Sequence, residues 1–174
     1  TKEVDEKLKI SSSKLQPWID ENVPNAGKIQ TVEQFKGGQS NPTYKIVTDN
    51  KSLVLRRKPP GKLLPSAHAV DREYKVITAL YETDVPVPKT YGLCEDDDVA
   101  GTAFFVMDFL DGDLFWDPMI PSMTNSDRTE IYKNKNKTLA KLHSVDYKKI
   151  GLIDYGKPGN YVARQVSRWS KQYR

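Results

Sequence analysis

The stretch FKGGQSNPTY, from Phe35 to Tyr44, contains the residue types best suited to bind an anionic ligand. Gly37 and Gly38 lack the Cβ atoms that would keep a ligand away from the backbone, so consecutive N–H groups can point at anionic oxygens. Short polar side chains that can donate hydrogen bonds follow at Ser40, Asn41 and Thr43. The stretch therefore suggests a phosphate-binding loop, although many glycine-rich turns between strands have a similar composition and bind nothing.

Two adjacent arginines, Arg56 and Arg57, end the segment LVLRR, which is typical of a β-strand. Because side chains alternate along a strand, Arg56 shares a face with Val54, whereas Arg57 shares the opposite face with Leu53 and Leu55. If the glycine-rich stretch folds over the Val54 face, Arg56 reaches the phosphates of a ligand and Arg57 lies on the far side. The alternative is that both arginines mark a solvated strand end.

A carboxylate, Glu73, falls on the apolar stripe of the next predicted helix, which we expect to begin with Ser66 as its N-cap and to run to about Tyr81. The rest of that stripe is Val70, Tyr74, Ile77 and Leu80 or Tyr81. A desolvated ion without a partner costs several kcal/mol, so Glu73 either pairs with Arg56 or bends out to water at the edge of the stripe.

A sheet in the first part of the chain must position these groups. Leu15, Trp18 and Ile19 have helical spacing and predict a short helix that covers one side of it. Strands are predicted at 29–35, 44–48, 53–57, 91–95 and 102–109. The acidic residues 96–98 are expected to form a turn, and residues 102–112 the edge strand and a hinge. The predicted fold class is α+β, a five-stranded antiparallel sheet with one inserted helix.

Strand patterns give way to helical patterns after Asp111-Gly112, which places a lobe boundary near Leu110. We therefore divide the chain into an N-terminal lobe at 1–109 and a hinge with a partial helical lobe at 110–174. Within the second part, Asp127 and Glu130 resemble a capping box at the start of a helix. The apolar stripe of that helix is Leu139 and Leu142.

A last helix is predicted from Tyr161, and it stops at Arg174 without a glycine cap, a proline or a polar tail. We therefore expect the chain to be the small lobe and the beginning of the large lobe of a longer enzyme.

The composition is that of a globular protein without disulfides, with 174 residues, 37% hydrophobic content, one cysteine and two histidines. Cys94 has no cysteine partner, and so few thiols and imidazoles cannot build a structural zinc site. We therefore expect an intracellular, cytoplasmic protein. The most apolar run, at 102–110, is far shorter than a bilayer span and carries Asp108, so no membrane association is expected.

The net charge of +4 and the pI near 9.0 raise the question of nucleic-acid binding. The basic excess lies mainly after Lys133, where it is spread along predicted helices without a known nucleic-acid motif. We do not expect a nucleic-acid partner, because a site for phosphorylated ligands accounts for the positive charge as well. Affinity that falls steeply with salt would favour the nucleic-acid alternative.

The order of these features resembles the small lobe of protein-kinase-like enzymes, and more narrowly the aminoglycoside phosphotransferase and choline kinase family. The closest resemblance is to the phosphotransferase domains fused to, or associated with, acyl-CoA dehydrogenases. The strings that carry it are FKGGQSNPTY, LVLRRKPPG, DREYKVITAL, VPVPKTYGLCED, FFVMDFLDG, TLAKLHSVD and YVARQVSRW.

The resemblance implies ATP-dependent phosphoryl transfer to the hydroxyl of a small-molecule acceptor, with Mg²⁺ as a second cofactor and an association with an acyl-CoA dehydrogenase. It implies that Arg56 contacts the α and β phosphates where most kinases have lysine, and that Glu73 is its ion-pair partner. The residues that it places over the ATP phosphates are Gly37, Gly38, Gln39 and Ser40.

For the adenine, the resemblance implies contacts from the backbone carbonyl oxygen of Asp108 and the backbone N–H of Leu110. Met107 and Val54 would pack near the adenine ring. Residues 115–118 would approach the acceptor.

The resemblance also implies a catalytic loop, H-G-D-x-x-x-x-N, and a later D-x-E or D-F-G metal ligand. Residues 143–146 look like the first of these motifs and residues 153–156 look like the second. The fifth position after Asp146 is Gly151 where an asparagine is required, and Asp154 follows Asp146 too closely for the intervening hairpin. We interpret both as structural and expect the catalytic groups and metal ligands downstream of this sequence. The alternative function is a non-catalytic, pseudokinase-like module that binds a nucleotide or a partner protein.

Overall fold

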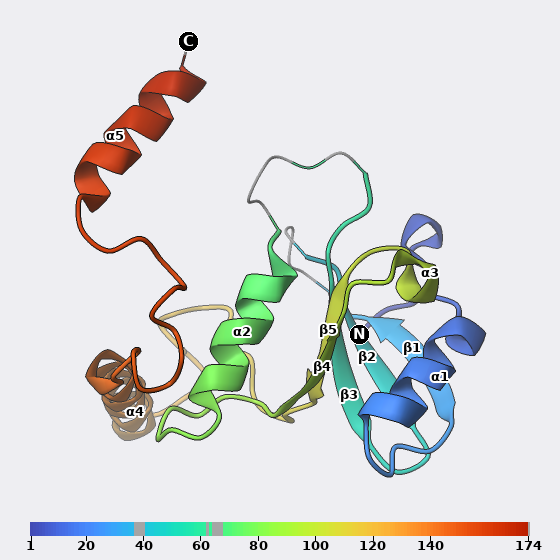
Figure 1. Cartoon of the computed structure of the whole chain (residues 1–174). Helices are drawn as coiled ribbons and strands as arrows, with labels where there is room; N and C mark the ends of the chain where they lie inside the picture. Colours follow the sequence, from blue (N-terminus) through green and yellow to red (C-terminus); the bar gives the residue numbers. More distant parts are fainter. Residues whose placement is uncertain (37–40, 62, 64–67, 174) are drawn as a thin grey trace.

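The computed structural model describes residues 1–36, 41–61, 63 and 68–173. Its centre is one five-stranded antiparallel sheet with the strand order β1-β2-β3-β5-β4 (Figure 1). The strands are β1 (Ile29–Gln34), β2 (Thr43–Thr48), β3 (Ser52–Arg57), β4 (Thr90–Cys94) and β5 (Phe104–Asp108). The helices are the short 3₁₀ helix η1 (Glu6–Leu8), α1 (Ser12–Asn22), α2 (Val70–Leu80), α3 (Asp97–Ala100), α4 (Asn125–Ser144) and α5 (Tyr161–Gln172). The predicted α+β class is confirmed.

Helices lie on both sides of the sheet, with α1 on one side and α2 on the other (Figure 1). The α1 side holds the main hydrophobic core, whose fully buried members include Leu15, Ile19, Tyr44, Leu53, Leu55, Phe104 and Val106. On the α2 side, Tyr74 packs against Phe105 with the ring centroids 6.0 Å apart. The alternation of β3 therefore sends Leu53 and Leu55 into the core and Val54 and Arg56 towards α2.

The prediction that residues 102–112 contain the edge strand is wrong, because β5 lies between β3 and β4. After α2 the polypeptide returns on the far side of β5, so β4 takes the edge position. The side chains of Phe104, Phe105 and Val106 are all 0% exposed. Such an uninterrupted apolar run is typical of a strand that is covered on both faces.

Several local predictions also need correction. The acidic turn at 96–98 contains the short helix α3, because the Asp96 carboxylate caps the N–H of Asp98 and Gly101 ends the helix at φ 85°. The sheet therefore has this second insertion besides α2. Helix α2 begins at Val70 with Ala69 in the N-cap position, and Ser66 lies outside the described residues.

The predicted capping box of Asp127 and Glu130 is wrong, because α4 begins one turn earlier with Thr124 as its N-cap, whose hydroxyl donates to the Asp127 carboxylate. The Thr124 hydroxyl accepts a hydrogen bond from the N–H of Asp127, and threonine is a favourable N-cap residue.

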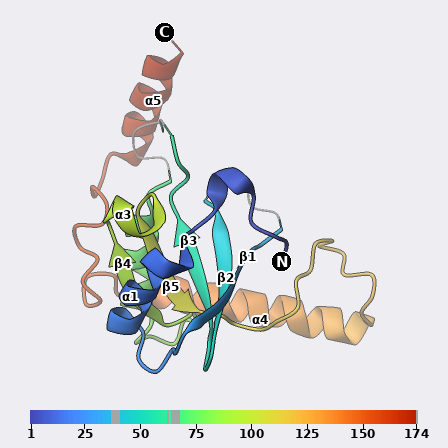
Figure 2. The same cartoon turned by 90° about the vertical axis from the view of Figure 1, so that its right-hand side faces the viewer.

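The second part of the protein is more open than the sheet. Helix α4 extends past the edge of the sheet (Figure 2), and α5 projects away from the rest of the molecule (Figure 1). The large apolar side chains that follow β5 are exposed, namely Leu110, Phe115 and Trp116. Within the part of the protein that the structure describes, none of the helices has the length and apolar character needed to cross a membrane.

Candidate nucleotide-binding site

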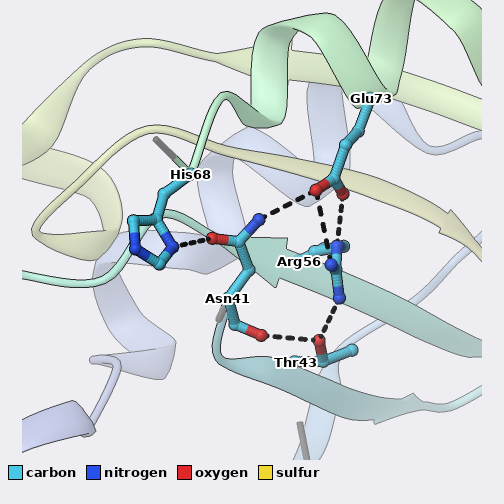
Figure 3. Close-up of polar contacts among 5 residues, drawn as sticks. All are labelled: Asn41, Thr43, Arg56, His68 and Glu73. Atoms are coloured by element: carbon cyan, nitrogen blue, oxygen red, sulfur yellow. Dashed lines mark hydrogen bonds and ion pairs between the residues drawn. The ribbon is translucent and has the colours of Figure 1, made fainter. Parts of the chain in front are cut away.

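The Arg56 guanidinium and the Glu73 carboxylate form an ion pair between β3 and α2 (Figure 3). Arg56 donates from Nε to Glu73 Oε2 and from Nη2 to Glu73 Oε1 at 3.3 Å. The two side chains are 31% and 35% exposed, so the pair lies at the surface of the site rather than in the core. This confirms the predicted pairing and excludes the alternative that Glu73 turns out to water.

Asn41 and Thr43, two residues of the FKGGQSNPTY stretch, are hydrogen-bonded to this pair. Thr43 Oγ1 accepts a hydrogen bond from Arg56 Nη1 at 3.0 Å and donates to the backbone oxygen of Asn41 at 3.0 Å. The side-chain amide of Asn41 donates to Glu73 Oε1 at 2.9 Å. On its other side, Asn41 Oδ1 lies 2.9 Å from His68 Nδ1 (Figure 3).

Arg57 lies on the opposite face of β3 and is only 4% exposed. Its guanidinium donates to the carbonyl oxygens of Ala100 and Leu8, at 2.5 and 3.0 Å, and to the Tyr44 hydroxyl at 2.8 Å. Burial lowers the pKa of the Arg57 guanidinium from its ordinary value, because removal from water disfavours the charged form. The alternative that both arginines mark a solvated strand end is therefore wrong.

Val54 and Met107 are register partners on β3 and β5, so the two residues predicted to flank adenine are neighbours. Next to them, the rings of Phe35 and Phe109 stack with centroids 6.3 Å apart, and Lys45 Nζ lies 4.2 Å from the Phe109 ring centroid. This aromatic pair brings the start of the FKGGQSNPTY stretch next to the residue after β5.

Asp108 and Leu110 follow the same strand towards the hinge. The Asp108 carboxylate accepts a hydrogen bond from the Tyr91 hydroxyl at 2.6 Å. Burial, followed by this hydrogen bond, raises the pKa of Tyr91 to about 12. The side chain of Leu110 is exposed, and among the described residues its backbone N–H has no backbone hydrogen-bond partner.

The structure thus brings together Arg56 with Glu73 and Val54 with Met107, and it places Asp108 and Leu110 at the end of the same sheet. The predicted phosphate-covering residues Gly37, Gly38, Gln39 and Ser40 lie outside the described residues. Sequence reasoning missed His68 as a member of the site. The available signal was weak: a histidine five positions before the glutamate on the stripe of α2.

The chemistry of the described site is that of anion binding. The guanidinium N–H groups of Arg56 that neither Glu73 nor Thr43 uses have no partner among the residues that the structure describes, and they could bind phosphate oxygens. A metal site is not formed by these residues, since no group of three or more His, Cys, Asp or Glu side chains that could hold an ion occurs in the described ranges. The look-alike residue Asp146 caps a local turn, where Oδ1 accepts from the N–H groups of Lys148 and Lys149 at 3.0 and 3.3 Å.

Relatives of this protein include proteins with acyl-CoA dehydrogenase names. It is 54% identical over 147 residues to "Probable acyl-CoA dehydrogenase IBR3" of Arabidopsis thaliana, a match that covers 82% of this sequence and 18% of that protein. It is 40% identical over 169 residues to "Acyl-CoA dehydrogenase family member 11" of Homo sapiens, covering 95% of this sequence and 22% of the relative. The chain therefore spans about a fifth of the length of these curated relatives.

A solved structure from Ralstonia eutropha, described as a "putative aminoglycoside phosphotransferase", has the same fold. It matches with a TM-score of 0.79 and 48% sequence identity, over 95% of this protein and 47% of the solved one. The sheet with α2 beside it is therefore the kinase-like fold of aminoglycoside phosphotransferases. The model of the phosphotransferase enzyme family matches residues 31–174, which include the whole of the site described above. This chain belongs to the phosphotransferase enzyme family.

Proposed function

We propose that the protein is the nucleotide-binding part of an ATP-dependent phosphotransferase that acts on a small-molecule hydroxyl. The observation that carries the proposal is the Arg56–Glu73 pair, which is hydrogen-bonded to Asn41 and Thr43 on the face of β3 opposite the core. A guanidinium held by a carboxylate on its Nε side keeps other N–H groups available for phosphate oxygens. Family membership supplies the reaction class.

We assign the proposed contacts residue by residue. Arg56 binds the α and β phosphates, while Gly37, Gly38, Gln39 and Ser40 cover them. Val54 and Met107 pack on the adenine ring, which receives backbone contacts from Asp108 and Leu110. We divide the protein functionally at Leu110, with the nucleotide-binding lobe at 1–109 and the hinge and helical part at 110–174.

The proposal also includes a metal ion and an acceptor. Bound Mg²⁺ would neutralise charge between the β and γ phosphates. The described residues do not form a site for that ion, and the 174 residues contain no H-G-D-x-x-x-x-N string. The names of the relatives add an association with an acyl-CoA dehydrogenase to the proposal, within one polypeptide or as a complex.

A second candidate function is a non-catalytic module that binds nucleotide. In such a module the groups around Arg56 would bind the nucleotide, and Asp146 would only cap its local turn. Both functions require nucleotide binding by this protein, and they differ in turnover.

The test of nucleotide binding is calorimetric titration of the 174-residue protein with ATP and with adenosine. Arg56→Ala should weaken ATP binding by about tenfold or more, because a charge-assisted contact to phosphate is lost, and should leave adenosine binding unchanged. Lys75→Ala is the matched control, since Lys75 is an exposed cation on α2 two residues from Glu73. Equal effects of the two substitutions, or no binding of ATP by the unsubstituted protein, would overturn the proposed function.

A further inference from the structure

The hydrogen bonds around Arg56 form a closed ring. Asn41 Nδ2 donates to Glu73, Arg56 donates to both Glu73 and Thr43, and Thr43 Oγ1 donates back to the backbone oxygen of Asn41. Every donor in the ring meets an acceptor, so the polarity is consistent throughout (Figure 3). Asn41 belongs to the FKGGQSNPTY stretch and is only 4% exposed.

The Glu73 carboxylate fixes which way the Asn41 amide points. Carboxylate oxygens only accept hydrogen bonds, so the NH₂ group of Asn41 must face Glu73 and the Oδ1 atom must face His68. Since Oδ1 also only accepts, His68 Nδ1 must carry the proton in their 2.9 Å contact. The polarity of the ring therefore extends one residue further, to the imidazole.

His68 reaches Asn41 from a constrained position immediately before α2. Its φ is 59°, in the left-handed region that residues other than glycine seldom adopt, and its carbonyl oxygen accepts from the N–H of Val70, the first residue of α2. Asn41 is thus bound by two residues on or beside the first turn of α2, His68 and Glu73. A shift of α2 relative to the segment before β2 would break both contacts.

We propose that Asn41 and His68 are positioning residues, which hold Glu73, and through it Arg56, in the orientation that binds phosphate. The consequence for ATP rests on the proposed function, whereas the orientation of Arg56 does not. Neither residue touches the phosphates in this proposal. Asn41 acts through Glu73, and His68 acts through Asn41 by donating from Nδ1.

The first test uses nuclear magnetic resonance without nucleotide. The protein has two histidines, so their ring nitrogen signals can be assigned with His143→Gln. We expect His68 to carry its proton on Nδ1, and the Arg56 Nε–H signal, assigned with Arg56→Lys, to show the shift of a carboxylate-bound guanidinium. An unprotonated Nδ1 at His68 would overturn the proposal.

The second test compares His68→Asn with His68→Gly. Both replacements tolerate a positive φ, but only asparagine retains a donor near the place of Nδ1. The Arg56 Nε–H signal should be unchanged in His68→Asn and displaced in His68→Gly. Asn41→Ala should displace the Arg56 Nε–H signal as well. If Asn41→Ala fails to fold, the comparison of His68→Asn with His68→Gly still decides the test.

The same variants are then titrated with ATP and adenosine. His68→Gly should bind ATP about fivefold more weakly, the equivalent of one hydrogen bond, with adenosine binding unchanged and His68→Asn within about twofold of the unsubstituted protein. Equal losses for ATP and adenosine would indicate a merely structural role and overturn the proposal. If the unsubstituted protein binds no ATP, the proposed function fails, while the Arg56 signal still decides whether His68 and Asn41 position the guanidinium.

Discussion

Arg56 and Arg57 are neighbours in the sequence, and the sheet gives them opposite surroundings. Arg56 is partly exposed and pairs with a carboxylate, whereas Arg57 is buried and donates to two carbonyl oxygens and a hydroxyl. A buried cation needs such partners, because an unsatisfied charge in the core is costly. The strand thus separates a cation suited to ligand binding from one that ties η1 and α3 to the sheet.

The Arg56–Glu73 pair should contribute modestly to stability because water reaches about a third of each side chain. We expect Glu73→Ala to lower the free energy of unfolding by about 1–2 kcal/mol, since Asn41 and Arg56 both lose an acceptor. The double variant Arg56→Met with Glu73→Met should cost less than the sum of the two single substitutions. Chemical denaturation of the unsubstituted, single and double variants measures this coupling, and strict additivity would contradict it.

Tyr91 should make the stability depend on pH in the alkaline range. Its pKa is raised from 10.0 to about 12 in the folded state, so the folded protein retains a proton that the unfolded state releases. This contribution is fully present below pH 10 and is lost as the pH rises towards 12. Tyr91→Phe should therefore flatten the fall in unfolding free energy between these values.

The control for this experiment is Tyr147→Phe, which removes the hydroxyl of an exposed tyrosine. Denaturant titrations at several alkaline pH values give the slope of the unfolding free energy against pH for each protein. If the unfolding free energy falls with pH equally in Tyr91→Phe and in the unsubstituted protein, folding does not raise the pKa of Tyr91.

At the scale of elements, α1 packs on the sheet at a position where there is no room for a side chain. A Cβ atom on Gly92 of β4 would lie 3.0 Å from Trp18 Cζ2 and 3.3 Å from Asn22 Oδ1. Trp18 is itself held edge-on against Phe104, with the ring centroids 5.0 Å apart, so it has little freedom to give way.

We therefore expect Gly92→Ala to destabilise the protein by about 1–3 kcal/mol through overpacking between β4 and α1. Gly112→Ala is the matched control, because no atom lies within 4 Å of its added Cβ. Thermal unfolding of the two variants gives the comparison. A melting temperature for Gly92→Ala equal to that of the control would show that α1 moves to accommodate the methyl group.

The elements that could be predicted from the sequence are those with a strong local pattern. The period-two alternation of β3 assigned Val54, Arg56 and Arg57 to the correct faces, and the helical period of α2 placed Glu73 near Arg56. The order of the strands in the sheet could not be predicted from local sequence patterns. The edge assignment of β5 failed because the path of the polypeptide after α2, a nonlocal feature, decides which strand pairs with β3.

The site could be predicted only in part for a related reason. Arg56 and Glu73 each stood out against an apolar pattern, so their pairing followed from desolvation. His68 precedes the first turn of α2 with a left-handed backbone that periodicity does not report. Its contact with Asn41 joins residues 27 positions apart in the sequence, and only the fold brings them together.

At the scale of the molecule, the sheet and the helical part differ in how much they bury. The described residues of α4 and α5 include none that is buried, whereas β3 and β5 contain several fully buried side chains. Apolar burial is the main source of local stability, so the helices should open more easily than the sheet. Hydrogen exchange read by mass spectrometry should show rapid exchange in α5 and strong protection in β3 and β5. Equal protection of α5 and β3 would mean that α5 has packing partners in solution.

The last prediction concerns turnover by the 174-residue protein, for which we expect nucleotide binding without phosphoryl transfer. The reaction requires a positioned acceptor hydroxyl and metal-bound phosphates, and the sequence lacks the H-G-D-x-x-x-x-N string that serves these needs in the family. Loss of a cooperating catalytic set typically removes several orders of magnitude in rate. ATP consumption should therefore stay at background with aminoglycosides, choline and hydroxyacyl-CoA compounds as acceptors.

Asp146→Asn separates this expectation from its alternative. Because the Asp146 carboxylate caps the turn formed with Lys148 and Lys149, the substitution should leave ATP binding and the background rate unchanged. Measurable phosphoryl transfer by the unsubstituted protein that disappears in Asp146→Asn, with ATP affinity preserved, would show that Asp146 is the catalytic aspartate. The turn at 146–149 could then persist when an acceptor binds, because both backbone N–H groups donate to Oδ1, and Oδ2 has no hydrogen-bond partner among the described residues.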